Sequence, residues 1–176
     1  MHAQLLSLNM LNQEIKLLIL LIFFAKISFA MPDDREKLLE LSADTADLNQ
    51  QSHRGEYIGS VELNQGTSHL RAASAITEGN KQNKLVMALA KGNAKEQAHF
   101  WVLTALDKPP LHAYADTIQY FPDKHLIVLS GNARVVQGDN SFSAPKINYD
   151  TLKQHVLSKN DGKERTVIII HPEKKS

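Results

Sequence analysis

The stretch from Leu126 to Asn140 reads Leu-Ile-Val-Leu-Ser-Gly-Asn-Ala-Arg-Val-Val-Gln-Gly-Asp-Asn, and it decides which fold class we predict. Residues 126–136 are rich in aliphatic and β-branched side chains, which is typical of a β-strand. Residues 137–140 carry the Gly, Asp and Asn that favour a tight turn. A further apolar run follows at 146–149, so the stretch predicts neighbouring strands joined by a turn.

An internal repeat relates this stretch to an earlier one at an offset of 72 residues. The spacing holds without a gap over some 25 residues (about two strands and a turn), which makes chance a weaker explanation than duplication. Repetition of this kind predicts stacked units that bury their faces against their neighbours. The matching segments are 43–45 with 115–117, Gly59 with Gly131, 65–66 with 137–138 and, after one deletion, 73–76 with 144–147.

The repeat also predicts which side chains face the interior. In 57–63 the apolar residues alternate with polar ones. Because Glu62 and Asn64 lie on the face exposed to water, Val61 and Leu63 lie on the opposite face, which points into the interior. The equivalent residues of the second copy then face inward, with Arg134 outside, unless a bulge changes the parity. The predicted inward residues of the second copy are Leu129, Ala133 and Val135, and Ala46 and Leu48 correspond to Ile118 and Tyr120.

Short strands at roughly 10-residue spacing indicate an all-β protein rather than a helical one. Only 33–47 has any helical character, and a strand at 38–41 is an equally good interpretation of it. The predicted strands are 57–63, 70–76, 85–90, 100–104, 111–120, 126–136, 146–149, 155–157 and 166–170.

Composition sets limits on function. The 176 residues are 43% hydrophobic and 22% charged, which favours a folded domain over a disordered chain. With 20 basic and 19 acidic residues the chain lacks the basic surplus of a general nucleic-acid binder. There is no cysteine, so a disulfide framework and a thiolate metal site are excluded.

The N-terminal sequence predicts a signal peptide for export. Residues 17–25 form a short apolar run after Lys16, and Ser28-Phe29-Ala30 is a small-x-small cleavage motif. A membrane anchor would need about 20 apolar residues, and Lys26 ends this run after nine. We expect cleavage after Ala30, which leaves a mature chain (31–176) with no net charge, a domain at 31–172 and a loose tail at 173–176; Met10 is an alternative start.

No constellation for catalysis or cofactor binding is visible in the sequence. The histidines that follow the signal are far apart and form no HExxH or similar pair, so no metal site is predicted. No GxSxG elbow and no glycine-rich phosphate loop occurs. We therefore expect a protein that is not an enzyme and has no cofactor.

The interior residues leave two interpretations open. Residues such as Phe100, Tyr120, Ile147 and Tyr149 would be ordinary core in a closed sandwich, and they would line a groove for acyl chains in an open-ended roll. Residues 166–170 are apolar on both faces, so at a sheet edge they would pair with another chain.

Several of these segments resemble the LptA family of periplasmic lipopolysaccharide transport proteins. The likeness runs from about Leu38 to Pro172 and is strongest at 111–172, whereas residues 78–98 depart from the family pattern. The segments that carry it are Ala-Asp-Thr-Ile-Gln-Tyr at 115–120, Leu-Ile-Val-Leu-Ser-Gly-Asn-Ala at 126–133, Lys-Ile-Asn-Tyr at 146–149 and Thr-Val-Ile-Ile-Ile-His-Pro at 166–172.

The resemblance implies an open-ended, twisted antiparallel β-jellyroll that binds the lipid A part of lipopolysaccharide in its interior. Family members stack head to tail between an inner-membrane LptC-like protein and an outer-membrane LptD-like translocon. Matched to the family pattern, Leu39, Leu41, Phe100 and Tyr120 are implied lipid contacts, the two leucines by a looser match.

Together, the parity and the resemblance predict a periplasmic bridge protein with an interior lipid path and an apolar edge for self-association. The alternatives are a membrane-anchored LptC-like member of the same pathway and an assembly module that binds no lipid. The predicted lipid-binding residues are Leu39, Leu41, Leu48, Val61, Leu63, Phe100, Ile118, Tyr120, Leu129, Val135, Ile147 and Tyr149, and the predicted edge residues are Val167, Ile168, Ile169 and Ile170.

Overall fold

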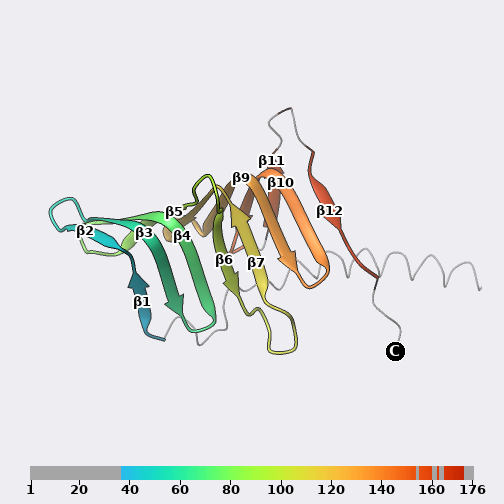
Figure 1. Cartoon of the computed structure of the whole chain (residues 1–176), viewed down its shortest axis with the longest axis horizontal. Helices are drawn as coiled ribbons and strands as arrows, with labels where there is room; N and C mark the ends of the chain where they lie inside the picture. The colour runs from blue at the N-terminus through green and yellow to red at the C-terminus, as the bar shows by residue number, and fades with distance from the viewer. Residues whose placement is uncertain (1–36, 154, 160–161, 163–164, 173–176) are drawn as a thin grey trace, which may run out of the picture.

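The chain folds into one large antiparallel sheet of twelve strands that is bent along its length (Figure 1). The computed structural model describes residues 37–172 except 154, 160, 161, 163 and 164, so the predicted signal peptide (1–30) and tail (173–176) lie outside the described residues. The strands are β1 (Leu39–Ser42), β2 (Thr45–Asn49), β3 (Arg54–Gln65), β4 (Ser68–Gly79), β5 (Leu85–Lys91), β6 (Ala98–Val102), β7 (Leu111–Ala115), β8 (Thr117–Phe121), β9 (Leu126–Gln137), β10 (Asn140–Asp150), β11 (His155–Lys159) and β12 (Val167–Ile169), with a short 3-10 turn at Pro122–Lys124.

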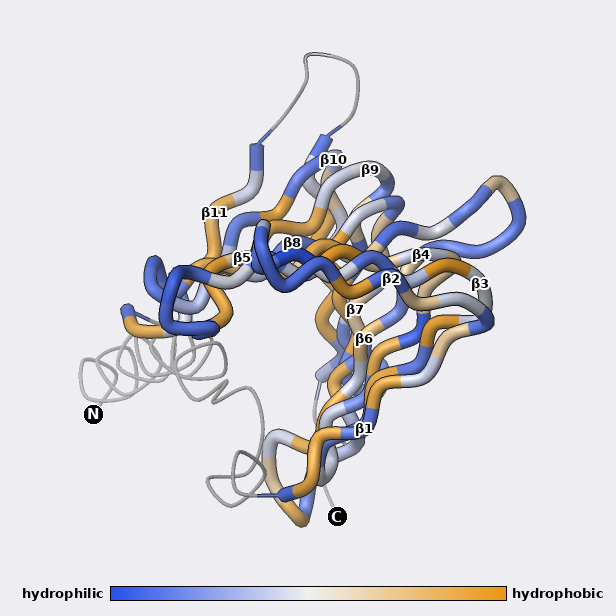
Figure 2. The backbone as a smooth tube through the Cα atoms, turned by 90° about the vertical axis from the view of Figure 1, so that its left-hand side faces the viewer, coloured by the Kyte–Doolittle hydropathy of each residue, from blue (hydrophilic) through white to orange (hydrophobic). Residues whose placement is uncertain are grey.

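Four long strands, β3, β4, β9 and β10, pass through both layers of the bent sheet. One half of β3 pairs with β2 and the other half pairs with β1, and β9 pairs in the same divided way with β8 and β7. The short strands therefore separate into two walls: β2, β5, β8 and β11 in one, and β1, β6, β7 and β12 in the other. Figure 2 looks along the long axis and shows these walls diverging from the bend, so that the sheet encloses an inner face.

The bend in β3 is produced by a bulge at Gly59. The pairing of β3 with β4 shifts register between Ile58 and Val61, and both Gly59 (φ 80°) and Ser60 (φ 46°) have positive φ. The N–H of Asp44 donates to the carbonyl of Gly59 over 2.9 Å, and the Asp44 carboxylate lies where a Cβ on Gly59 would be. Glycine is thus required here by conformation and by space.

The second bulge repeats the first in detail. Gly131 (φ 78°) and Asn132 (φ 48°) stand 72 residues after Gly59 and Ser60, and the N–H of Asp116 donates to the carbonyl of Gly131 over 2.9 Å. The Asn132 side chain also donates to the Asp116 carboxylate over 3.2 Å. The repeat predicted from sequence is therefore a structural repeat.

One detail of the predicted alignment is wrong. No deletion is needed, because Ala75 occupies the place of Ile147: each pairs with the bulged strand at equivalent residues, Tyr57 and Leu129. Both repeats carry the same bulge at the same place, so the offset of 72 residues continues past it, and the Ala-x-x-Ile spacing shared by 73–76 and 144–147 does not mark equivalent positions.

The strand predictions are confirmed with two corrections. Residues 111–120 form two strands rather than one, because the Asp116 N–H leaves the ladder to bond the Gly131 carbonyl. The helical interpretation of 33–47 is wrong for its described part, where β1 and β2 form instead, and the alternative strand at 38–41 is confirmed by β1. The predicted parity is also confirmed, since Val61, Leu129 and Ala133 are buried and Arg134 is exposed.

We expect Gly131→Ala to destabilise the fold strongly. The left-handed conformation costs an alanine about 1–2 kcal/mol. The new Cβ would also displace the Asp116 carboxylate and disturb the hydrogen bond between the Asp116 N–H and the Gly131 carbonyl. We therefore expect the free energy of unfolding to fall by ~3 kcal/mol or more. Gly162 (φ 88°) has no atom near its Cβ position, so Gly162→Ala should cost only about 1 kcal/mol. Equal shifts of the two urea midpoints would contradict the steric argument.

Candidate functional site: the apolar inner face

One wall of the inner face carries an unbroken row of apolar side chains, one from each strand that crosses it. Because antiparallel partners place directly opposed side chains on the same face, the register defines the row. Its members are, in order, Leu41, Leu63, Leu70, Phe100, Ala113, Val135, Phe142 and Ile168.

The facing wall carries two further rows, which are largely apolar and which we call the upper and the middle row. Both run across eight strands from β2 to β11 without a break. The upper row is Leu48, Gly55, Thr77, Ala88, Tyr120, Ile127, Tyr149 and Val156. The middle row is Ala46, Tyr57, Ala75, Ala90, Ile118, Leu129, Ile147 and Ser158.

The twelve residues predicted to line a lipid path gather on this inner face. Ten of them lie in the three rows just described. Val61 is buried at the bend, and Leu39 pairs with Gln65 at the start of β1. The structure thus brings the predicted residues together; whether they contact lipid stays a prediction.

On the inner face, packing is closer around Tyr149 than at the edge strand β2. Phe100, Ile127, Val135 and Val156 pack against both buried clusters, one of which contains Tyr149 at 5% exposure. In the first repeat, by contrast, Leu48 remains 66% exposed. Burial raises the pKa of the Tyr149 phenol to about 12, with the Asp150 charge adding to the shift, so this hydroxyl stays neutral in the interior.

Among the described residues, the two ends of the sheet present strand edges that pair with no further strand. Val167, Ile168 and Ile169 form β12, which pairs with β10 on one side only, and these residues and Ile170 are about half exposed. At the opposite end, β1 and β2 pair only with β3. Exposed apolar edges of this kind are templates for another strand.

The outer face carries a stack of rings that sequence reasoning missed. Trp101 lies between His69 (ring centroids 4.9 Å apart) and His99 (4.6 Å), and Tyr114 stacks on His99 at 4.2 Å. His99 Nε2 and His112 Nδ1 share a hydrogen bond of 2.9 Å. The rings come from three strands, and the register of β4, β6 and β7 brings them together, so no local motif could have revealed the whole stack.

His99 contacts three other rings of the stack. Burial, with smaller contributions from the neighbouring His112 and Arg71, lowers the pKa of His99 to about 4. The Arg71 guanidinium lies 5.5 Å from the Trp101 ring centre and pairs with Glu62 at 3.0 Å. Among the described residues, no three acidic or histidine side chains come together in a way that could hold a metal ion, and no helix there is suited to crossing a membrane.

Comparisons with known proteins agree with this architecture. Residues 40–155 match the model of the family described as LptA/(LptD N-terminal domain) LPS transport protein. The chain belongs to the LptA family. It is 30% identical over 159 residues to the lipopolysaccharide export system protein LptH of Pseudomonas aeruginosa, covering 86% of this chain and 89% of that protein.

Two further relatives support membership of the family. The lipopolysaccharide export system protein LptA of Escherichia coli K12 is 26% identical over 147 residues, which cover 82% of this chain and 77% of that protein. The crystal structure of LptH from Pseudomonas aeruginosa, a periplasmic component of the lipopolysaccharide transport device, aligns with a TM-score of 0.69 at 31% identity, over 80% of this chain and all of that one. The predicted all-β fold and the predicted family are confirmed.

The outer stack predicts how stability responds to acid. The fold lowers the pKa of His99 from its ordinary 6.5 to about 4, so the unfolded chain binds this proton first as the pH falls. The contribution of neutral His99 is therefore complete above pH ~6.5 and is lost between about pH 6.5 and 4. Between about pH 7 and 4.5 the wild type should lose more free energy of unfolding than His99→Phe. Equal losses, measured by urea unfolding with circular dichroism, would contradict this role.

Proposed function

We propose that the protein is a periplasmic carrier that binds the lipid A part of lipopolysaccharide on its inner face and stacks head to tail into a bridge between the two membranes. The observation that carries this proposal is the three inner rows, which run without interruption from one unpaired end of the sheet to the other. A path of this form suits acyl chains that must enter at one end and leave at the other.

The repeat supplies a template for the contact between copies. Inside the chain, β6 of the first repeat pairs with β7 of the second, and β5 pairs with β8. In the second repeat β12 and β11 take the places of β6 and β5, because both pairs flank equivalent residues of β4 and β10. The next copy would offer β1 and β2 where the chain itself uses β7 and β8.

This equivalence gives a register for the contact. Phe100 and Trp101 pair with Ala113 and His112, whose counterparts in the first repeat are Leu41 and Glu40. Ile168 of one copy should therefore oppose Leu41 of the next, and Ile169 should oppose Glu40. All three inner rows would then continue from copy to copy.

The proteins at the two ends of the bridge would bind in the same way as the copies bind one another. The family resemblance implies an inner-membrane LptC-like protein at one end of the bridge and an outer-membrane LptD-like translocon at the other. Each would add a strand to an edge that the chain leaves unpaired. We expect an exported protein without catalytic activity, because the inner face offers packing surfaces rather than paired acids, bases or nucleophiles.

Lipid contact can be tested by site-specific photo-crosslinking in cells that are exporting lipopolysaccharide. A probe at Phe100 or Tyr120 should give a lipopolysaccharide adduct, since both lie in inner rows, whereas a probe at the exposed Arg134 should give none. A folded protein without adducts at either inner position would favour the assembly module that binds no lipid. Persistence of residues 17–30 in the exported protein would favour the anchored LptC-like alternative.

The stacking register can be tested with cysteines, because the wild-type chain has none. The double variant Glu40→Cys and Ile169→Cys should form a disulfide-linked ladder on mild oxidation, since directly opposed residues lie about 4.5–5.5 Å apart. The control pairs Glu40→Cys with Val167→Cys, which are diagonal in this register at about 7–8 Å and should crosslink poorly. A ladder from the control but not from the test pair would show that the register is wrong.

A further inference from the structure

The two halves of the upper row differ in size in a way that the repeat makes directly comparable. The first half consists of Leu48, Gly55, Thr77 and Ala88, and the second half of Tyr120, Ile127, Tyr149 and Val156. Each residue of the first half has a larger side chain at the equivalent place in the second half. The strand pairing is equivalent in both halves, and in the first repeat Tyr57 fills part of the space, because its hydroxyl lies 2.7 Å from the place of a Cβ on Gly55.

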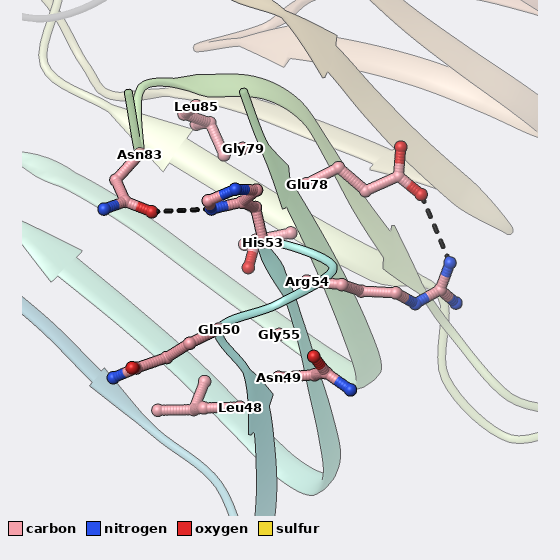
Figure 3. Close-up of a pocket in the computed structure, with 11 residues that line it drawn as sticks. Leu48, Asn49, Gln50, His53, Arg54, Gly55, Glu78, Gly79, Asn83 and Leu85 are labelled. Carbon is pink, nitrogen blue, oxygen red and sulfur yellow. Dashed lines mark hydrogen bonds and ion pairs between the residues drawn. The ribbon is translucent and has the colours of Figure 1, made fainter. Parts of the chain in front are cut away.

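A hollow of about 230 Å³ remains beside Leu48, Gly55 and Thr77 (Figure 3). Its lining includes Gly55, Gly79 and Thr77 from the inner face, with Leu48 and Leu85 as apolar walls. The turn residues Asn49, Gln50, His53 and Asn83 form a polar rim, in which His53 and Asn83 share a hydrogen bond of 2.8 Å.

The charges beside the hollow do not favour an anionic ligand. Arg54 pairs with Glu56 at 2.8 Å and with Glu78 at 3.2 Å, and Lys84 pairs with Asp123 at 2.7 Å. These cations are already balanced by carboxylates, so a phosphate would have to displace a partner. An uncharged alkyl segment would displace none.

The second repeat shows what fits the same place. There Tyr149 and Ile127 supply apolar groups, packed with Phe100, Val135 and Val156. Since the protein fills this volume with aliphatic and aromatic carbon in one copy, the chemistry of the other copy suits a ligand of the same kind.

We propose that the hollow of the first repeat holds an acyl chain of the lipid cargo, and that the Tyr149 cluster closes the equivalent place in the second repeat. The proposal rests on the proposed function and deepens it, because it makes one molecule hold lipid in its N-terminal half. Lipid passes the second half only when Tyr149 leaves the cluster, so the two repeats act as a holding site followed by a constriction.

The test exchanges the side chains of the two repeats. Thr77→Tyr copies Tyr149 into the hollow, and Tyr149→Thr copies Thr77 into the constriction. The matched controls are Thr77→Ser and Tyr149→Phe, which change little volume. The single tryptophan, Trp101, lies on the outer face, so its emission together with circular dichroism verifies the fold of each variant.

Binding of a dansyl-labelled undecanoic acid to the full chain without its signal would be followed by fluorescence, with purified lipid A as competitor. The wild type should bind one probe that lipid A displaces. Thr77→Tyr should lower the affinity at least tenfold, Tyr149→Thr should raise the stoichiometry from one to two, and both controls should behave as the wild type.

The outcomes separate this proposal from the function on which it rests. Wild-type protein that binds neither probe nor lipid A would overturn the proposed function. Lipid A binding that Thr77→Tyr leaves unchanged would overturn the holding site alone. Should Tyr149→Thr not fold, the comparison of Thr77→Tyr with Thr77→Ser still decides the matter, because it leaves the Tyr149 cluster intact.

Discussion

The whole structure depends on the bend that Asp44 and Asp116 make at Gly59 and Gly131. At each bulge an aspartate N–H bonds the glycine carbonyl and its carboxylate fills the space beside the missing side chain. Twelve-residue strands without this bend would continue in one layer, and their apolar side chains would face water. With it, the same strand contributes to both walls, so the inner face is enclosed by continuous backbone rather than by separate sheets.

Much of this arrangement could be predicted from the sequence, and the failures have a common cause. The alternation of apolar and polar residues predicted that Val61 faces the interior. The repeat then predicted the same orientation for the equivalent residues of the second half, such as Leu129. The split at Asp116 could not be predicted, because a bulge changes pairing without changing hydrophobicity, and the Ala-x-x-Ile likeness of 73–76 and 144–147 suggested a deletion that the strand register does not contain. The ring stack on the outer face was not predicted for a related reason: the register between separate strands places Trp101 of β6 beside His69 of β4 and His112 of β7.

The ring stack distinguishes the junction within the chain from the junction proposed between copies. Within the chain, His99, Trp101, His112 and Tyr114 join β6 to β7 on the outer face. At the proposed contact their places are taken by Val167, Ile169, Glu40 and Ser42, none of which is aromatic. The two junctions would share backbone pairing and inner rows, but only the internal one has the additional stacking. A permanent joint inside the molecule and a reversible one between molecules follow from that difference.

A lipid carrier must release the acyl chains that it binds, and the difference between the two halves of the inner face bears on that release. Full burial of an acyl chain of about 12 methylenes would stabilise the bound state by roughly 10 kcal/mol, and several enclosed chains would hardly leave. A short hollow bordered by polar turns buries only part of a chain, which keeps binding weak enough for release. The Tyr149 constriction opposes further sliding, so movement in one direction must be driven from outside the chain. In a stack, each open first repeat would receive lipid from the constricted half of its neighbour, and the alternation of wide and narrow segments would divide one long transfer into short steps.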